Sequence, residues 1–352
     1  MRICFLDRST KLETINDLET RPRGGMVTSL FKVSDYLSQR GHEVSVISDI
    51  KAQGITKKGV LWWDCGDGKN PWHEQIAPFD FLVCNRGVGG FDIKAKHRVL
   101  WTHDLPHAGQ IPEPKNIKAF SATVFMSKYA EKIWRYYYRD IGKSFYIPNG
   151  VDKSIFYPRN KRPGYLIYAS APNRGLRRLP LIFDSIQARV KRFVYMRAYS
   201  NLAKLHPNEV DEKDDLSETY NAVKESKVEL CDPIPQSDLA VELGKASLMI
   251  LPSSYPEICS NTILQSLCSG TPVVTTGSLG SAGQWISSKN GILTQWQPHD
   301  YMAYTLNVVR ESVKILEDEN LHRKLINNAA KTKIYSWEEI GAQWEAMLRR
   351  LS

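Results

Sequence analysis

The sequence predicts an α/β protein with two doubly wound parallel sheets, one in each half of the chain. Three observations support this fold class. The length of 352 residues suits about two domains of roughly 150 residues each. Short apolar runs alternate with segments of helical periodicity through both halves. A turn-rich basic segment at 158–164, Pro-Arg-Asn-Lys-Arg-Pro-Gly, lies between the halves and is typical of a linker.

The first half begins with a short apolar segment that predicts a buried strand. Val27, Leu30, Val33 and Leu37 then recur at helical spacing, and Gly41 would end that helix. We expect helices at 26–39 and at about 127–139, and strands at 2–6, 43–47, 60–63, 79–83, 98–101 and 122–126. A further short strand should begin at about 145 and run into the turn Pro148-Asn149-Gly150. This alternation predicts a parallel sheet covered on both faces.

The second half repeats the pattern. We expect strands at 165–169, 193–198, 227–231, 247–251, 272–275 and 291–294, and helices at 176–190, 236–245, 260–269, 280–287 and 300–331. The polar, acidic segment 203–221 predicts a loop or an exposed helix. A final amphipathic helix should follow Ser336, with one apolar face formed by Trp337, Ile340, Trp344, Met347 and Leu348.

The charge of the chain limits its partners. The formal net charge is +9, and the basic residues are spread along the chain, with local groups at 128–139, 174–178 and 189–197. Because there is no long basic tail or RNA-binding motif, we expect no nucleic acid partner. The helix at 127–139 carries three adjacent tyrosines, and we expect its aromatic side chains to pack inside with the charges outside. Contact with an amphipathic surface is the alternative.

Targeting signals and metal-binding cysteines are not evident in the sequence. No apolar run approaches the roughly 18–20 residues of a membrane span, and the first residues lack the apolar core of a signal peptide. The six cysteines have no CxxC or zinc-type spacing, which favours free thiols in a reducing compartment. We therefore expect a cytoplasmic protein, with peripheral contact to an acidic membrane face as a hypothesis.

The segment 252–274 is the strongest indication of a ligand site. A buried strand ends at Pro252, a short loop carries Glu257, and Gly270-Thr271-Pro272 leads into the next strand. Glu257 should therefore lie at the carboxyl edge of a parallel sheet, where open α/β folds bind ligands. A helix beginning near Ser260 would direct backbone amides toward an anion or a sugar hydroxyl. We expect this role for Ile258, Cys259, Ser260 and Asn261.

This segment resembles glycosyltransferase family 4, a group of retaining enzymes with the GT-B fold: two Rossmann-like domains with a deep inter-domain cleft. The family has a glutamate, seven residues and a second glutamate, followed by Gly-Thr-Pro-Val-Val. Glu257 matches the first acid, and Gln265 replaces the second. The resemblance implies that Glu257 contacts the donor sugar and that Gln265 holds the ribose. The amide lacks the charge-assisted hydrogen bond that a carboxylate would form.

The segment 168–176 resembles the family loop that holds the donor diphosphate. Arg174-Gly175 fits the position of a Lys-Gly pair, whereas the position of an upstream arginine falls at Ala169 or Ser170. Arg177 or Arg178 could compensate for that missing arginine. A leaving nucleoside diphosphate gains negative charge in the transition state, and a fixed guanidinium stabilises it.

Other resemblances lie outside these two segments. Gly24-Gly25 resembles the family's glycine-rich first loop, and His103 its loop histidine that lines the sugar pocket, with His107 as a competing candidate. The segment 147–152 matches the signature before the linker. Pro233 and Ile234 lie where the nucleotide base should bind. The resemblance implies an acceptor-side domain at 1–157, a nucleotide-sugar domain at 158–335, and a helix at 336–352 that packs back on the first domain.

The function that the resemblance implies is transfer of a sugar, with retention, from a nucleoside-diphosphate sugar to a hydroxyl acceptor such as a glycan or a lipid-linked glycan. Glu257, His103 and Arg174 are the catalytic candidates. We expect no cofactor, and no metal, because no Asp-x-Asp occurs at a suitable position. Two alternatives stay open: a related GT-B epimerase, hydrolase or phosphorylase, and a non-catalytic binding protein in which Gln265 marks lost activity.

Overall fold

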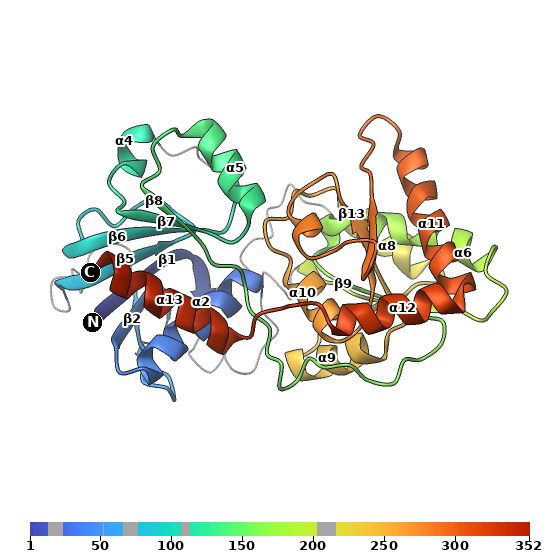
Figure 1. The fold of residues 1–352 in the computed structure, drawn as a ribbon, viewed down its shortest axis with the longest axis horizontal. Helices are drawn as coiled ribbons and strands as arrows, with labels where there is room; N and C mark the ends of the chain where they lie inside the picture. Colours follow the sequence, from blue (N-terminus) through green and yellow to red (C-terminus); the bar gives the residue numbers. More distant parts are fainter. Residues whose placement is uncertain (13–23, 52, 66–76, 107–112, 203–215) are drawn as a thin grey trace. The chain divides into compact units, whose positions relative to one another are not determined.

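A computed structural model describes residues 1–12, 24–51, 53–65, 77–106, 113–202 and 216–352, and the chain forms two compact units (Figure 1). Unit 1 comprises Met1–Gly150 and Tyr335–Ser352, and unit 2 comprises Val151–Ile334. The division falls at Gly150, before the segment expected as the linker. The chain already packs in unit 2 at Phe156, whose carbonyl accepts a hydrogen bond from Cys268 at 3.2 Å.

The sheet of unit 1 has the order β3-β4-β2-β1-β5-β6-β7-β8. Its strand pairs are parallel except for β3–β4, which is antiparallel. The strands predicted in the first half are confirmed, and the two-residue β3 is an addition. The bounds are β1 Arg2–Leu12, β2 Glu43–Ile50, β3 Gly54–Ile55, β4 Leu61–Asp64, β5 Phe79–Asn85, β6 Ala95–Thr102, β7 Ala122–Phe125 and β8 Lys143–Tyr146.

The helices of unit 1 are α2 (Gly25–Gln39), α4 (Pro114–Ile117), α5 (Lys128–Tyr137) and α13 (Trp337–Leu351). The four-residue α4 was not predicted. In α5, Trp134 and Tyr138 are buried, but Tyr136 is 85% exposed and Tyr137 41% exposed. The expectation that the aromatic side chains of this segment pack inside is therefore wrong for these two tyrosines.

Helix α13 packs on α2 and on one face of the sheet of unit 1 (Figure 1). Its five predicted apolar positions are all buried. Ser336 and Glu339 form a capping box at its first turn, which satisfies backbone groups that the helix cannot pair internally. At Gly341 a side chain would clash with Tyr36, because a Cβ atom would lie 2.2 Å from the ring. The glycine therefore allows the two helices to approach closely.

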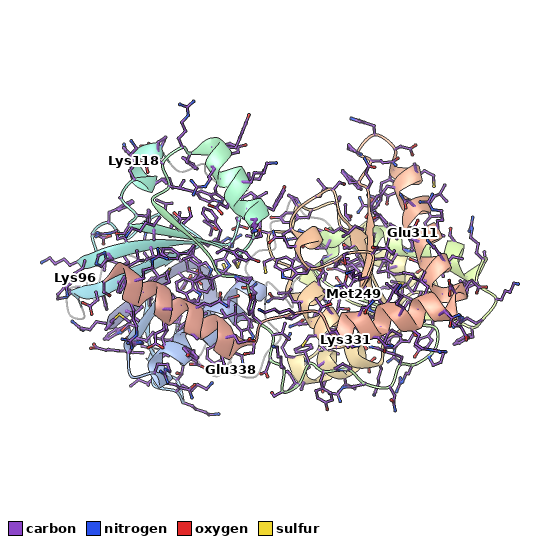
Figure 2. All side chains as sticks on the ribbon, viewed as in Figure 1. Lys96, Lys118, Met249, Glu311, Lys331 and Glu338 are labelled. Atoms are coloured by element: carbon purple, nitrogen blue, oxygen red, sulfur yellow. The ribbon has the colours of Figure 1, made fainter. Side chains whose placement is uncertain are left out.

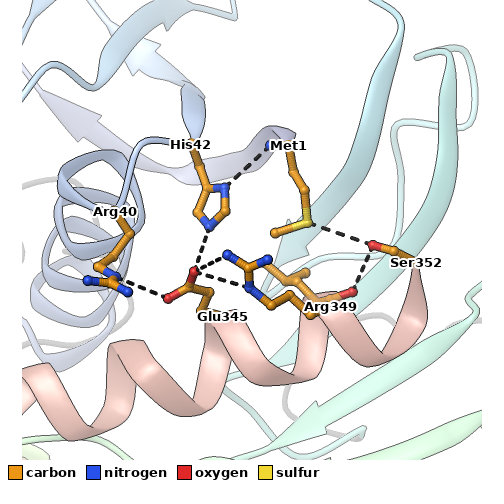
Figure 3. A network of polar contacts seen from close by, with 7 residues as sticks. Met1, Arg40, His42, Glu345, Arg349 and Ser352 are labelled. Atoms are coloured by element: carbon orange, nitrogen blue, oxygen red, sulfur yellow. Dashed lines mark hydrogen bonds and ion pairs between the residues drawn. The ribbon is translucent and has the colours of Figure 1, made fainter.

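Glu345 is the centre of a polar network between α13 and the start of the chain (Figure 3). Its carboxylate accepts hydrogen bonds from Arg349 at 2.8 Å and Arg40 at 3.3 Å, and lies 3.2 Å from Nε2 of His42. These hydrogen bonds, chiefly those of Arg349, lower the pKa of Glu345. Burial lowers the pKa of His42. Both groups therefore bind protons more weakly in the folded chain than in the unfolded chain.

The Glu345→Gln variant should lose stability in a pH-dependent way. The substitution removes the negative charge that faces Arg349, Arg40 and His42. It should therefore lower the free energy of unfolding by about 1–3 kcal/mol at neutral pH. A carboxyl with a depressed pKa stabilises the fold above about pH 4.3, its unfolded value, and that contribution disappears as pH falls further. Urea denaturation of the variant and the wild type should therefore converge in acid. Glu338→Gln, on the exposed first turn of α13 (Figure 2), should change stability by less than about 0.5 kcal/mol.

The sheet of unit 2 is parallel throughout and has the order β11-β10-β9-β12-β13-β14. In chain order, the strands that follow β9 are added on one side of the sheet, and the strands that follow β12 are added on the other side. The carboxyl ends of these two strands therefore form the switch point of the sheet, where this fold class binds ligands. The six predicted strands are confirmed as β9 Tyr165–Ala169, β10 Tyr195–Tyr199, β11 Glu229–Cys231, β12 Leu248–Leu251, β13 Val273–Thr276 and β14 Gly291–Thr294.

The helices of unit 2 depart from expectation in two places. The predicted helix 300–331 is two helices, because Asp318 leaves the helical conformation and caps the second one through the amide of Leu321. The predicted helix 280–287 is only the 3₁₀ turn Ala282–Gln284: Gly280 has a left-handed backbone with a φ of 76°, and the amide of Ser281 donates to the carbonyl of Glu257. The α-helices are α6 Leu179–Gln187, α8 Ser217–Lys224, α9 Gln236–Lys245, α10 Asn261–Cys268, α11 Tyr301–Glu317 and α12 Glu319–Ala330.

Side chains of the two units sort by polarity in the usual way (Figure 2). Met249 of β12 is fully buried, while Lys96, Lys118 and Lys331 lie on the surface. Among the helices that the structure describes, none is long and apolar enough to cross a bilayer.

Candidate donor site

The loops after β9 and β12 meet at the switch point of unit 2. The first loop carries Ser170 and Arg174, and the second carries Glu257. Arg174 donates from Nε to Oε1 of Glu257 at 2.7 Å, and the two side chains are 19% and 20% exposed. The guanidinium carbon of Arg174 also lies 3.5 Å from the ring centre of Tyr255. The two residues proposed to hold the diphosphate and the sugar are therefore in direct contact, partly shielded from water.

Two glycines, one in the loop after β9 and one in the loop after β13, allow those loops to approach the loop after β12. Gly175 has a φ of 102°, and a Cβ atom there would lie 2.2 Å from the carbonyl oxygen of Pro252. Gly280 has a φ of 76°, and a Cβ atom there would lie 2.4 Å from the carbonyl oxygen of Glu257. Any other residue would force the backbone apart at both positions. The geometry of the Arg174–Glu257 pair thus depends on backbone positions that only glycine occupies without strain.

The start of α10 lies next to Glu257 in the chain. Ile258, Cys259 and Ser260 are buried, and Asn261 is the first residue of the helix. The side chain of Ser260 does not cap the helix. The first amides of α10 are the groups expected to bind an anion or a sugar hydroxyl, and that role stays a prediction.

Gln265 points toward the loop that should receive the base. Its Nε2 donates to Oε1 of Gln236 at 2.7 Å, and the side chain is buried. Gln236 is the first residue of α9, which directly follows the loop holding half-buried Pro233 and Ile234. The amide of Gln265 therefore lies beside the proposed nucleoside region, and it already has a protein partner.

Ser170 and Arg178 have partners within the fold. The carbonyl of Ser170 accepts a hydrogen bond from Ser200 at 2.7 Å. Arg178 donates to the carbonyl of Pro252 and to the hydroxyl of Ser254. A direct phosphate contact was expected for Arg178, but its guanidinium is directed at the loop before Glu257.

The candidates Gly24, Gly25 and His103 belong to unit 1. Gly24 is the N-cap of α2 with an extended backbone, φ −64°, which other residues also adopt. The hydroxyl of Ser29 lies 2.7 Å from both the carbonyl oxygen of Gly25 and Oδ1 of Asn149, so Ser29 links the first turn of α2 to Asn149. His107 lies outside the described residues.

The ring of His103 lies against that of Trp101, with centroids 4.6 Å apart and ring planes tilted by 48°. Burial and the nearby charge of Arg86 lower the pKa of His103 to about 3, so its imidazole is neutral at physiological pH. In the described part of the chain, its Nε2 has no hydrogen-bond partner. A neutral imidazole can donate or accept one hydrogen bond at that atom, which suits a sugar hydroxyl better than a phosphate.

Two residues that sequence reasoning missed lie at these sites. Tyr255 supports Arg174, and its place directly before Pro256-Glu257 was the available signal.

Asn85 ends β5 opposite Trp101, and it is 2% exposed. Within the described ranges, neither polar atom of its side chain has a partner. An unsatisfied buried amide costs about 1–3 kcal/mol, which marks Asn85 as a candidate for contact with a polar ligand or a water.

Metal ligands are not gathered at either site. In the described ranges, no group of three or more His, Cys, Asp or Glu side chains could hold a metal ion.

Together the two units, each with a mostly parallel sheet between helices, define a GT-B protein. Solved structures share this fold over essentially the whole chain. Sucrose-phosphate synthase from Thermosynechococcus elongatus has a TM-score of 0.76 at 15% identity, with 100% of this chain and 99% of that chain covered. HepE from Anabaena, solved with UDP and glucose, has a TM-score of 0.72 at 15% identity, with 99% and 100% covered. WaaG, a glycosyltransferase involved in lipopolysaccharide biosynthesis, has a TM-score of 0.70 at 13% identity, with 99% of each chain covered.

The family resemblance is carried by the second half of the chain. Residues 206–311 match the model of a family described as glycosyl transferases group 1. This match includes Glu257, Gln265 and the whole of α10. No curated protein sequence matches the chain. The resemblance to group 1 glycosyl transferases is thus confirmed, and the narrower assignment to family 4 stays a prediction.

Proposed function

We propose that this protein is a glycosyltransferase that moves a sugar from a nucleoside-diphosphate sugar to a hydroxyl acceptor. The observation that carries the proposal is the Arg174–Glu257 contact at the switch point of unit 2. A guanidinium and a carboxylate side by side suit a ligand with an anionic part and a hydroxylated part. HepE, a neighbour with the same fold, was solved with UDP and with UDP-glucose, which favours a nucleotide-sugar donor.

In this reaction, Arg174 would hold the diphosphate while the bond between the anomeric carbon and the phosphate oxygen breaks. The acceptor oxygen forms the new bond, and its proton passes to the leaving phosphate oxygen on the same face, which gives retention. Glu257 would orient the sugar through its hydroxyls, and Gln265 would hold the ribose. The chain then contributes positioning and electrostatic stabilisation, without a covalent intermediate.

Binding and turnover test this proposal separately. Isothermal titration with UDP and UDP-glucose should show saturable binding, and each ligand should raise the melting temperature. Turnover of radiolabelled UDP-sugars with a panel of glycan and lipid-linked acceptors should depend on Glu257, and NMR of the product should show the donor's anomeric configuration. EDTA should leave the rate unchanged if the reaction needs no metal. Absence of binding to any nucleoside-diphosphate sugar would refute the proposal.

The same measurements separate the alternatives. An epimerase or hydrolase would consume the donor without an acceptor. A non-catalytic binding protein would bind the donor and turn over nothing across the panel. Replacing Gln265 by glutamate restores the second acid of the family pattern. If Gln265 marks lost activity, this variant should gain turnover, whereas an active enzyme should keep its rate within about tenfold, which corresponds to one hydrogen bond.

We also propose that the exposed face of α5 contacts an anionic lipid surface, where a lipid-linked acceptor would be found. Tyr136 is 85% exposed, and Lys128, Lys132, Arg135 and Arg139 are exposed beside it. Tyrosine favours the membrane–water interface. Each basic residue near such a surface contributes about 1 kcal/mol of attraction.

Vesicle sedimentation tests the membrane proposal. The protein should bind vesicles of phosphatidylglycerol and phosphatidylcholine, and it should not bind pure phosphatidylcholine. Lys132→Glu should weaken binding by about tenfold or more, because it removes one positive charge and adds a negative one. Lys331→Glu, on the surface of unit 2, should have a smaller effect. Equal binding to both kinds of vesicle, or an equal loss in the two variants, would contradict the proposal.

A further inference from the structure

The guanidinium of Arg178 is directed at the loop that carries Glu257. One terminal nitrogen donates to the carbonyl of Pro252 at 3.1 Å, and the other donates to the hydroxyl of Ser254 at 3.3 Å. The planar fork of a guanidinium can bridge two acceptors at a fixed spacing, whereas an ammonium group is a point charge on a flexible stem. Arg178 therefore links the start of α6 to the loop after β12.

Three aromatic rings flank this guanidinium. Its carbon lies 5.1 Å from the ring centre of Trp296, 4.9 Å from that of Tyr301 and 5.7 Å from that of Tyr304. These distances lie within the range of cation–π attraction. Trp296 follows β14, and the two tyrosines lie in the first turn of α11. The rings limit the guanidinium to the orientation that faces Pro252 and Ser254.

A second set of contacts fixes Ser253, which lies between Pro252 and Ser254 in the chain. The hydroxyl of Tyr304 lies 2.6 Å from that of Thr276, and the hydroxyl of Thr276 donates to the carbonyl of Ser253. Ser253 in turn accepts a hydrogen bond from the amide of Tyr255 at 3.1 Å. The contacts that begin at α11 thus end at the backbone amide of Tyr255, the residue whose ring lies against Arg174.

We propose that Arg178 is a positioning residue for the donor site. By holding Pro252 and Ser254, it places Tyr255 and Glu257 where they orient Arg174 toward the diphosphate. This role replaces the direct phosphate contact that the sequence suggested for Arg178, and it rests on the proposed function of the same site. In this arrangement the positive charge of Arg178 matters less than its two directed hydrogen bonds.

Two substitutions separate positioning from charge. Arg178→Lys keeps the positive charge and loses the fork, and Arg178→Met loses both. If Arg178 positions the loop, both variants should bind UDP about tenfold more weakly, the effect of losing roughly one hydrogen bond to the site. Arg310→Met is the control, because its side chain is 71% exposed on α11 and has no place in the proposed site, and it should bind UDP as the wild type does. Wild-type affinity in Arg178→Lys would overturn the proposal.

Hydrogen exchange tests the loop without any ligand. The amides of Tyr255 and Glu257 are both hydrogen-bonded within the loop, so their exchange rates report its order. In Arg178→Lys and Arg178→Met these two amides should exchange about tenfold faster, while amides of β9 and of unit 1 should keep their rates. Unchanged loop exchange would refute positioning. If the wild type binds no nucleoside-diphosphate sugar, the proposed function fails, and the exchange result still decides the role of Arg178.

Discussion

Replacing Arg174 by methionine should lower kcat by about 10²- to 10³-fold, the range seen when one preorganised donor to a developing negative charge is removed. The diphosphate becomes more negative as the sugar leaves. This guanidinium therefore stabilises the transition state more than it stabilises the bound donor. UDP affinity should fall by a smaller factor for the same reason. Steady-state kinetics and UDP titration measure the two effects on one preparation.

Arg310→Met is a suitable control for Arg174→Met. Its side chain is 71% exposed and pairs with Glu311 on α11, so both kinetics and binding should match the wild type. Glu257→Ala provides the complementary comparison, because it removes the hydrogen-bond partner of Arg174. If Arg174 served only to hold Glu257, the two variants and the double variant would lose activity equally and UDP binding would be intact. That pattern would contradict a diphosphate contact.

The pairing of Arg174 with Glu257 was accessible from sequence because it follows from topology. Each residue comes shortly after a strand, and the two strands, β9 and β12, are neighbours in a parallel sheet. Parallel strands bring their carboxyl ends to one edge. Tyr255 could not be assigned in the same way, since an aromatic residue in a loop packs inward more often than it supports an arginine. Its role depends on a backbone path that no periodicity encodes.

The failures of sequence reasoning share one cause. The segment 280–287 has residues compatible with a helix, but the amide of Ser281 is taken by the carbonyl of Glu257, far away in the chain. Tyr136 was expected to pack inside, but Trp134 and Tyr138 already fill the space beneath α5. The phosphate contact expected for Arg178 stays a prediction, but three rings from more than a hundred residues later orient its guanidinium toward Pro252 and Ser254. Tertiary contacts decided each case, and local pattern does not report them.

The parallel strands were predictable because a buried strand leaves a short run rich in apolar and β-branched residues. All four residues of β12, Leu248–Leu251, and all four of β13, Val273–Thr276, are buried. Helix α13 was predictable for a different reason, since its apolar residues recur at helical spacing and Ser336 precedes them. The close packing of the Tyr36 ring on the backbone of α13 at Gly341 could not be predicted from the sequence.

Trp344→Ala should be among the most destabilising single substitutions in unit 1. The indole is fully buried between the rings of Trp101, at 4.6 Å, and Phe5, at 6.2 Å. Removing a buried tryptophan side chain costs about 3–5 kcal/mol, partly because the cavity cannot close. Urea denaturation followed by circular dichroism would measure the loss, and Trp344→Phe should retain more of the stability because it refills part of the volume.

Hydrogen exchange on the Trp344→Ala variant would locate that loss. Helix α13 comes from the end of the chain but forms part of the core of unit 1 with β1 and β6. Exchange should therefore accelerate in β1 and β6, which are formed by residues far earlier in the sequence, and it should stay near the wild-type rate in β9 and β12. Acceleration confined to α13 itself would mean that the helix does not contribute to the stability of the sheet of unit 1. Acceleration in β1 would mean that the first 150 residues form a complete core only after the last helix has docked on them.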